Sequence, residues 1–149
     1  MTIPRFYVPG PWTSDRITFP EKASHHAMRV LRMRNGDEAE VFDGEGRTAR
    51  GRTEFSSEGT VLIAESYPEH GRESPLFITL AQAFVSPDKM EWITEKAVEA
   101  GASRIVFFPA ARSVTKLSGD KLTKRLEKLR ATAVSACEQC GRSRIPEIE

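Results

Sequence analysis

Apolar and polar positions alternate in short stretches through the first half of the chain, a pattern typical of half-buried β-strands. Three of these stretches are rich in β-branched and aromatic residues: 5–8, 16–19 and 59–66. Residues 37–53 also alternate, and the sequence DGEG at 43–46 predicts the turn of a hairpin. One helix, residues 23–32, interrupts the strands. Several short strands with a single helix predict a small β-barrel over residues 1–71.

The pattern changes after residues 67–75, a polar segment with Pro and Gly that we predict to be a linker. Residues 76–85 form a continuous apolar run, which is typical of a strand buried on both faces. Residues 104–109 repeat this pattern, and residues 144–149 begin what we interpret as a third strand. The second half therefore reads as a separate part of the chain.

Two helices are predicted between these strands. Ser86 suits the N-cap of the first helix, with Pro87 at the first helical position and Gly101 just past its end. The second helix spans residues 120–140, and its apolar residues recur at spacings of three and four: Leu122, Leu126, Leu129, Ala133, Ala136 and Cys140. The β-α-β-α-β order predicts a parallel, doubly wound sheet.

Such a sheet needs more than two complete strands and cover on both faces. The chain stops as the third strand begins. We therefore expect the chain to be a fragment of a longer protein, or its remaining half to be disordered or cleaved.

Composition places the chain among ordinary soluble proteins, with 39% hydrophobic and 29% charged residues. It has no run of about 18 apolar residues and no basic-then-apolar start, so we expect a cytoplasmic protein. Residues 1–71 carry 9 Lys and Arg against 11 Asp and Glu, whereas residues 72–149 carry 13 against 10. Residues 112–130 alone hold seven basic and two acidic residues, a local basic face that suits a polyanion.

The Cys137-x-x-Cys140 pair raises the question of a redox or metal site. A redox pair usually opens a helix, where the dipole lowers the thiol pKa, but this pair closes one. A zinc site needs four ligands, and the three histidines show no paired spacing. We interpret the cysteines as small packing residues and expect no metal.

Other candidates in the second half have both a plain and a functional interpretation. Glu91, Glu95 and Glu99 share one helix face, either as a solvated face or ordered by an arginine such as Arg112. Ser86 and Arg112-Ser113 follow the two predicted strands, at the edge where parallel sheets bind ligands, although loop polarity alone would explain them.

The long helix carries a basic run that is either a solvated face or a set of phosphate contacts: Lys116, Lys121, Lys124, Arg125, Lys128 and Arg130. Glu138 and Arg142 are four apart where this helix ends and can form a local ion pair. In the first half, Arg5, His26, Arg29 and Arg32 suit RNA contact, or else His26 is a core residue with solvated arginines. The sequence has no glycine-rich phosphate loop and no Ser-His-Asp pattern.

Five stretches together resemble one family: IPRFYV at 3–8, HAMRVLRMRNGD at 26–37, FDGEG at 42–46, ESPLFITLAQAFVSPDKMEWITEKAVEAGASRIVFFPAARSV at 73–114, and KRLEKLRATAVSACEQCGRSRIPEI at 124–148. The chain is similar over nearly its whole length to the ribosomal RNA small subunit methyltransferase E family, which methylates uridine N3 in bacterial 16S rRNA. The resemblance implies an α+β fold with a PUA-like RNA-binding β-barrel in residues 1–71. It also implies the first part of an α/β SPOUT, or trefoil-knot, methyltransferase domain in residues 72–149, S-adenosylmethionine (SAM) as methyl donor, and a cytoplasmic homodimer.

The family's main SAM-binding elements, a Gly-Pro-Glu-Gly-Gly segment and a loop with Glu-Thr, are missing from this sequence. The residues of the SAM pocket therefore stay unassigned, and we expect the chain alone to be inactive. The alternative is a non-enzymatic RNA-binding module.

The resemblance places the family's polar signature on the following residues: Arg5, His26, Arg32, Lys96, Glu99, Arg112, Glu138, Gln139 and Arg142. Arg112, Glu138 and Arg142 are the candidate catalytic residues, with Glu99 and Gln139 also in the signature. The candidate RNA-binding residues are Arg5, His26, Arg29, Arg32, Lys96, Lys116, Lys124 and Arg125. Uridine N3 must lose its proton to accept a methyl group, and a cation nearby, first of all Arg112, would stabilise the negative charge.

Overall fold

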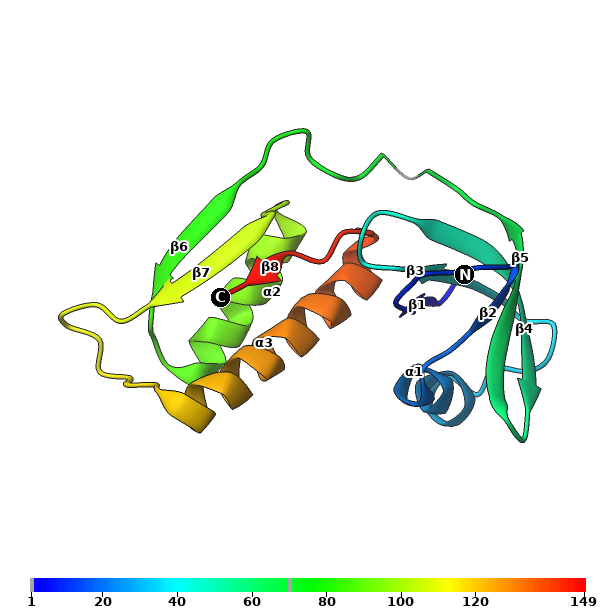
Figure 1. Ribbon diagram of the computed structural model, residues 1–149, viewed down its shortest axis with the longest axis horizontal. Coiled ribbons are helices and arrows are strands. Elements are labelled where there is room, and N and C mark those ends of the chain that lie inside the picture. Colours follow the sequence, from blue (N-terminus) through cyan, green and yellow to red (C-terminus); the bar gives the residue numbers. More distant parts are fainter. Residues whose placement is uncertain (1, 70) are drawn as a thin grey trace. The chain divides into compact units, whose positions relative to one another are not determined.

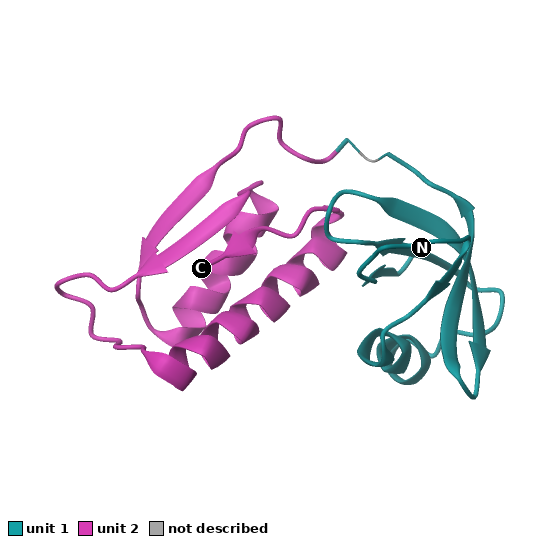
Figure 2. Ribbon diagram, in the orientation of Figure 1, with its two compact units in different colours: residues 1–71 teal, residues 72–149 magenta. Residues whose placement is uncertain are grey.

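A computed structural model describes residues 2–69 and 71–149. The chain divides into unit 1, residues 1–71, and unit 2, residues 72–149, drawn in teal and magenta in Figure 2. The division falls inside the segment that we predicted to be a linker.

Unit 1 is built on a mixed five-stranded sheet in the order β1-β3-β4-β5-β2 (Figure 1). The strands are β1 (Arg5–Tyr7), β2 (Arg16–Thr18), β3 (Glu38–Phe42), β4 (Thr48–Ser56) and β5 (Gly59–Ser66). The predicted hairpin is confirmed, since β3 and β4 are antiparallel neighbours. Its turn is held by the Asp43 carboxylate, which accepts the backbone N–H groups of Glu45 and Arg47 at 2.8 and 3.0 Å.

The sheet of unit 1 curls around a hydrophobic core, as the predicted barrel requires. All five strands contribute buried side chains, and the two edge strands meet: the rings of Phe6 in β1 and Phe19 after β2 are 5.1 Å apart. A β-bulge falls between Arg50 and Gly51, where β4 runs very close to β5. A Cβ atom on Gly51 would lie 1.8 Å from the Ile63 carbonyl oxygen, so only glycine fits there.

The helix predicted over residues 23–32 is present, but it is not a regular α-helix throughout. It begins as α1 (Glu21–His25) and continues as a π-helix, η1 (His26–Val30). In the π turn, the Leu31 N–H donates to the His26 carbonyl oxygen, five residues earlier, at 3.0 Å. The predicted helix is therefore confirmed, and the π turn is a feature that the sequence did not predict.

Unit 2 has three parallel strands in the order β6-β7-β8, which confirms the predicted β-α-β-α-β order. Its elements are β6 (Thr79–Ala83), α2 (Pro87–Glu99), β7 (Arg104–Phe108), α3 (Gly119–Cys140) and β8 (Glu147–Ile148). Both helices end close to the predicted positions, and they pack side by side (Figure 1). No helix within residues 2–69 and 71–149 is long and apolar enough to cross a membrane.

The expectation of a sheet covered on both faces is not met by the described residues. Figure 1 shows α2 and α3 on one face of the sheet, as the rule of right-handed crossovers requires for two successive connections in the same direction, and Ile105 and Phe107 of β7 are buried. The prediction of full burial was wrong for residues 76–85, because β6 is an edge strand. Ala81 on the uncovered face of β6 is exposed, and so are Leu76 and Phe77, which precede the strand and are 65% and 75% exposed.

Candidate nucleic-acid interface

Three of the four candidate RNA-binding residues in unit 1 lie in residues 21–34, which we call the α1–η1 segment and which comprises the two helical turns and the loop after them. These residues are exposed: His26, Arg29 and Arg32. His26 is therefore not a core residue, although its ring lies edge-to-face with that of Phe6, with the ring centroids 6.2 Å apart. Arg32 has a left-handed backbone, with φ of 53°, which is uncommon for a residue with a side chain. The loop after the π turn thus holds Arg32 in a costly conformation that keeps its guanidinium at the surface.

Arg5 lies in a different environment. Its guanidinium donates to the Glu40 carboxylate at 2.6 Å and lies over the Phe42 ring at 4.7 Å. The side chains of Arg5 and Glu40 are 11% and 3% exposed. Arg5 therefore joins β1 to β3 inside the wall of unit 1 and offers little surface to a polyanion.

The glutamate ladder on α2 is ordered by cations, as one of our two interpretations required, but Arg112 is not the arginine involved. Lys96 contacts Glu95 at 3.1 Å and Glu99 at 3.0 Å. The third glutamate, Glu91, accepts from Arg125 of α3 at 3.2 Å. The hydrogen bonds to Glu99 and Glu95 raise the pKa of Lys96 above its ordinary value.

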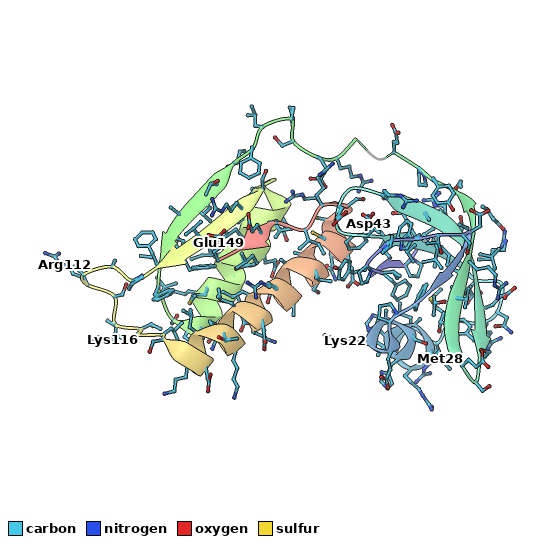
Figure 3. All side chains as sticks on the ribbon, viewed as in Figure 1. Lys22, Met28, Asp43, Arg112, Lys116 and Glu149 are labelled. Carbon is cyan, nitrogen blue, oxygen red and sulfur yellow. The ribbon has the colours of Figure 1, made fainter. Side chains whose placement is uncertain are left out.

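Arg112 lies instead in the loop that follows β7, and Figure 3 shows its side chain at the loop tip, pointing away from the sheet. No ion pair in the described part of unit 2 includes Arg112. Ser113 closes a tight turn here, because its hydroxyl accepts the Ala110 N–H at 3.1 Å. Arg112 and Lys116 are therefore exposed cations beyond the carboxyl end of a parallel strand, where such sheets bind ligands.

The basic run on α3 divides into two groups. Lys121, Lys124 and Lys128 are exposed, which suits either a solvated face or phosphate contact. Arg125 pairs with Glu91, and Arg130 donates to the Ile148 carbonyl oxygen at 3.0 Å. The two arginines thus help to hold α3 against α2 and β8.

Arg142 is the most buried of the candidate site residues in unit 2, at 5% exposure. Its guanidinium donates to the carbonyl oxygens of Val98 and Ala102, each at 2.9 Å, and to the Glu73 carboxylate at 2.9 and 3.1 Å. The other oxygen of Glu73 accepts the N–H groups of Ser143 and Arg144 at 3.0 Å.

This ion pair fastens the chain entering unit 2 to the ends of both helices. Burial acts to raise the pKa of Glu73, but the hydrogen bonds from Arg142 and from the backbone of Arg144 and Ser143 outweigh it, so the pKa is lowered. Sequence reasoning missed Glu73, because it lies in a polar segment 69 residues from its partner. The catalytic roles suggested for Arg142 and Glu138 stay predictions.

The cysteines fit the expectation of packing residues. Cys137 is buried, Cys140 is partly buried, and both are free thiols at the carboxyl end of α3. The Cys137 thiol donates to the Arg144 carbonyl oxygen at 3.5 Å. Within residues 2–69 and 71–149, no three His, Cys, Asp or Glu side chains are grouped to hold a metal ion.

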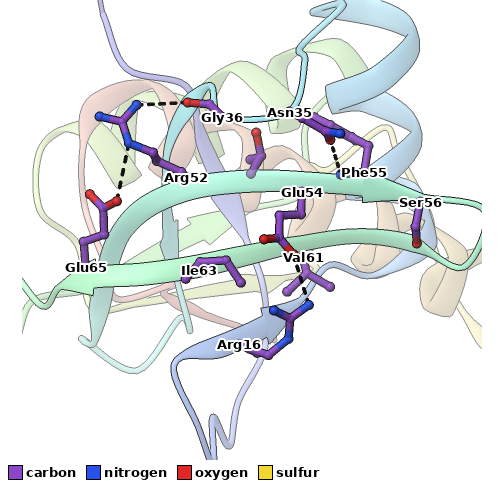
Figure 4. Close-up of a pocket in the computed structure, with 11 residues that line it drawn as sticks. Arg16, Asn35, Gly36, Arg52, Glu54, Phe55, Ser56, Val61, Ile63 and Glu65 are labelled. Carbon is purple, nitrogen blue, oxygen red and sulfur yellow. Dashed lines mark hydrogen bonds and ion pairs between the residues drawn. The ribbon is translucent and has the colours of Figure 1, made fainter.

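An open groove of about 650 Å³ lies on the outer face of the sheet of unit 1 (Figure 4). Its floor includes Val61 and Ile63 of β5. Its cations are already paired, Arg16 with Glu54 at 3.1 Å and Arg52 with Glu65 at 3.4 Å. Because the charges on its rim balance, the groove is a weaker candidate for a polyanion than the α1–η1 segment.

The chain matches known proteins over both units. A family model described as RNA methyltransferase domain matches residues 72–149, and one described as RNA methyltransferase PUA domain matches residues 19–64. Two relatives are named ribosomal RNA small subunit methyltransferase E, which agrees with the resemblance seen in the sequence. The one from Bacillus subtilis is 34% identical over 126 residues, which are 83% of this chain and 49% of the relative. The one from Mycobacterium bovis is 35% identical over 128 residues, 83% of this chain and 47% of the relative.

Solved structures of methyltransferases are similar to this chain over both units. A methyltransferase from Legionella pneumophila in complex with bound SAM has a TM-score of 0.92 at 30% identity, over 100% of this chain and 62% of its own. A ribosomal RNA small subunit methyltransferase E from Neisseria gonorrhoeae bound to SAM has a TM-score of 0.88 at 30% identity, over 99% of this chain and 62% of its own. The chain spans about half the length of the curated relatives it matches. Because the family model covers the whole of unit 2, the chain belongs to the RNA methyltransferase domain family.

Proposed function

We propose that the chain provides the RNA-binding domain and the first part of the catalytic SPOUT domain of a SAM-dependent methyltransferase. The substrate would be 16S rRNA of the small ribosomal subunit, methylated at uridine N3. The observation that carries the proposal is the similarity of the whole chain to a SAM-bound methyltransferase, at a TM-score of 0.92. The homodimer and the cytoplasmic location expected from the sequence remain part of this proposal.

The described residues of the loop beyond β7 are too exposed to enclose SAM. A nucleoside needs a concave, largely apolar pocket with a few polar groups. The loop beyond β7 is open instead, with Val114 96% exposed and Arg112 pointing outwards (Figure 3). We therefore assign no residue of this chain to SAM and derive no step through it.

The chain's own residues would act on the RNA. Neutral uridine carries a proton on N3. The uracil ring of the substrate therefore develops negative charge as this proton leaves. A guanidinium within hydrogen-bond distance of the uracil oxygens would stabilise that charge. Arg112 is our choice, because it is exposed and has no ion-pair partner in the described part of unit 2. Arg142 would act as a positioning residue, since its donors hold the frame of unit 2.

The test is methyl transfer from labelled SAM to small ribosomal subunits that lack the modification, using the protein as its gene encodes it. Arg112→Ala should slow transfer about 100-fold, the usual effect of losing one charge-stabilising donor, while RNA affinity stays within about threefold. Lys89→Ala, which removes another exposed cation of unit 2, is the matched control and should leave the rate unchanged.

An Arg112→Ala protein as active as the unsubstituted one would remove this residue from the reaction. The 149-residue chain alone should bind the RNA without transferring methyl groups. If the complete gene product also binds without transfer, the protein is an RNA-binding module and not an enzyme.

A further inference from the structure

Two large aliphatic side chains are exposed next to each other in the α1–η1 segment, residues 21–34. Val30 is 60% exposed and Leu31 43%. Two exposed cations flank them in the sequence, Arg29 and Arg32. A single exposed aliphatic residue needs no explanation, but a contiguous pair between cations is a candidate contact surface.

The π turn is the reason for this exposure. In a regular α-helix, Leu31 would lie four residues after Ala27, which is fully buried, and would share its face. The i to i+5 hydrogen bond from Leu31 to His26 widens the turn, and Met33 then packs against the core in place of Leu31. Since π turns are rare and are frequently found at functional sites, the surface that this one exposes is a candidate functional site.

The segment is firmly anchored under its exposed side chains. The hydroxyls of Ser24 and Thr60 form a buried hydrogen bond of 2.6 Å. At the other end, the Asn35 side chain accepts the Phe55 N–H at 2.6 Å. A surface that is held in place before binding loses little conformational entropy when a partner arrives.

The cations of the segment are available to a polyanion. No ion pair within residues 2–69 includes the side chain of Arg29, Arg32 or Arg34. By contrast, the arginines of β2 and β4 all face carboxylates. The combination of unpaired cations with a fixed aliphatic pair suits a partner that has both negative charge and apolar surface.

We propose that Val30 and Leu31 form an aliphatic wedge that packs against the faces of unpaired RNA bases, while Arg29, Arg32 and Arg34 contact the flanking phosphates. The inference rests on the proposed function, because it takes RNA as the partner. Base faces are apolar and become accessible where a helix ends or a base is bulged. Apolar side chains are known to enter between base steps in this way. The wedge would therefore direct unit 1 to irregular RNA and away from continuous duplex.

The test measures binding of the 149-residue chain to two synthetic RNA hairpins of equal length, one fully paired and one with a single bulged 2-aminopurine. The chain should prefer the bulged hairpin about tenfold, which corresponds to about 1.4 kcal/mol. Binding of the unsubstituted chain should also change the fluorescence of the bulged 2-aminopurine. The double variant Val30→Ser/Leu31→Ser should lose both the preference and this fluorescence change, while its RNA affinity keeps the same dependence on salt. Arg29→Ala should keep the preference and reduce the slope of log affinity against log salt by about one. Leu76→Ser, which changes an aliphatic residue exposed to a similar degree in unit 2, is the control.

The outcomes separate the two proposals. A chain that binds neither hairpin nor small-subunit rRNA contradicts the proposed function itself. A chain that binds both hairpins, with the double variant indistinguishable from it, overturns only the wedge. If the double variant loses binding to whole ribosomal subunits but binds naked RNA as the unsubstituted chain does, the surface docks a protein. If the unsubstituted chain binds anionic lipid vesicles in preference to RNA, the surface docks a membrane. Either result also overturns the wedge.

Discussion

The pair formed by Glu73 and Arg142 allows the sharpest test of how unit 2 is held together. Glu73→Gln keeps the shape of the side chain but removes its charge, so the Glu73 carboxylate no longer faces a guanidinium whose side chain is only 6% exposed. Removing one partner of a buried pair costs about 3–5 kcal/mol. Because the Glu73 side chain is 25% exposed and glutamine retains an acceptor, we expect a smaller loss, about 2–3 kcal/mol of the free energy of unfolding.

The assay is urea denaturation followed by circular dichroism at a helix-sensitive wavelength, which reports mainly on α2 and α3. Glu95→Gln is the matched control, since its ion pair with Lys96 is exposed and should be worth less than about 1 kcal/mol. If Glu73→Gln and Glu95→Gln have equal effects at neutral pH, the pair does not fasten unit 2 as we infer.

The pH dependence gives a second measurement on the same variant. The pKa of Glu73 is lowered in the folded state, so its contribution is complete above the ordinary carboxyl pKa of 4.5 and is lost as the pH falls through the lowered value. The stability difference between the unsubstituted chain and Glu73→Gln should therefore shrink steadily below about pH 4.5. A difference that stays constant down to the acid-unfolding range would refute the assigned direction.

Three further predictions concern packing. Gly51→Ala should destabilise unit 1 by about 2–3 kcal/mol, because the added methyl would meet the Ile63 carbonyl; an unchanged melting temperature would contradict this. Glu91→Gln should lower the free energy of unfolding by about 0.5–1 kcal/mol, and most of this loss should disappear when Arg125 is already replaced by alanine. If the effects of the two substitutions simply add, the ion pair does not link α2 to α3. A thiol reagent should label Cys140 in the folded chain and Cys137 only on unfolding, so labelling of both at one rate would show that Cys137 is accessible.

The local pattern was sufficient for the elements whose structure depends on near neighbours. The β3–β4 hairpin was predictable, because turn residues and alternating strands are adjacent in the sequence. The bounds of α3 followed from its apolar spacing and from Gly141, which adopts a left-handed conformation at the helix end. Parallel pairing of β6, β7 and β8 followed from the order of the elements.

The features that the sequence could not supply depend on distant or subtle neighbours. The spacing of Ala23, Ala27 and Leu31 is that of a regular α-helix, and nothing in it signals the π turn. The apolar run at 76–85 predicts a strand but not which of its faces is covered. Among the candidate site residues, the choice between a surface and a structural cation also stayed open: Arg5 and Arg142 proved to be held by Glu40 and Glu73.

The measurement that tests the central claim most directly is nucleoside mass spectrometry of 16S rRNA. The gene that encodes this chain would be expressed in a bacterial strain whose 16S rRNA lacks N3-methyluridine. Our account predicts that N3-methyluridine appears in the 16S rRNA when the gene is present and that Arg112→Ala strongly reduces it. Expression of the intact protein with no gain of N3-methyluridine, in a strain where a known enzyme of this kind restores it, would contradict the account.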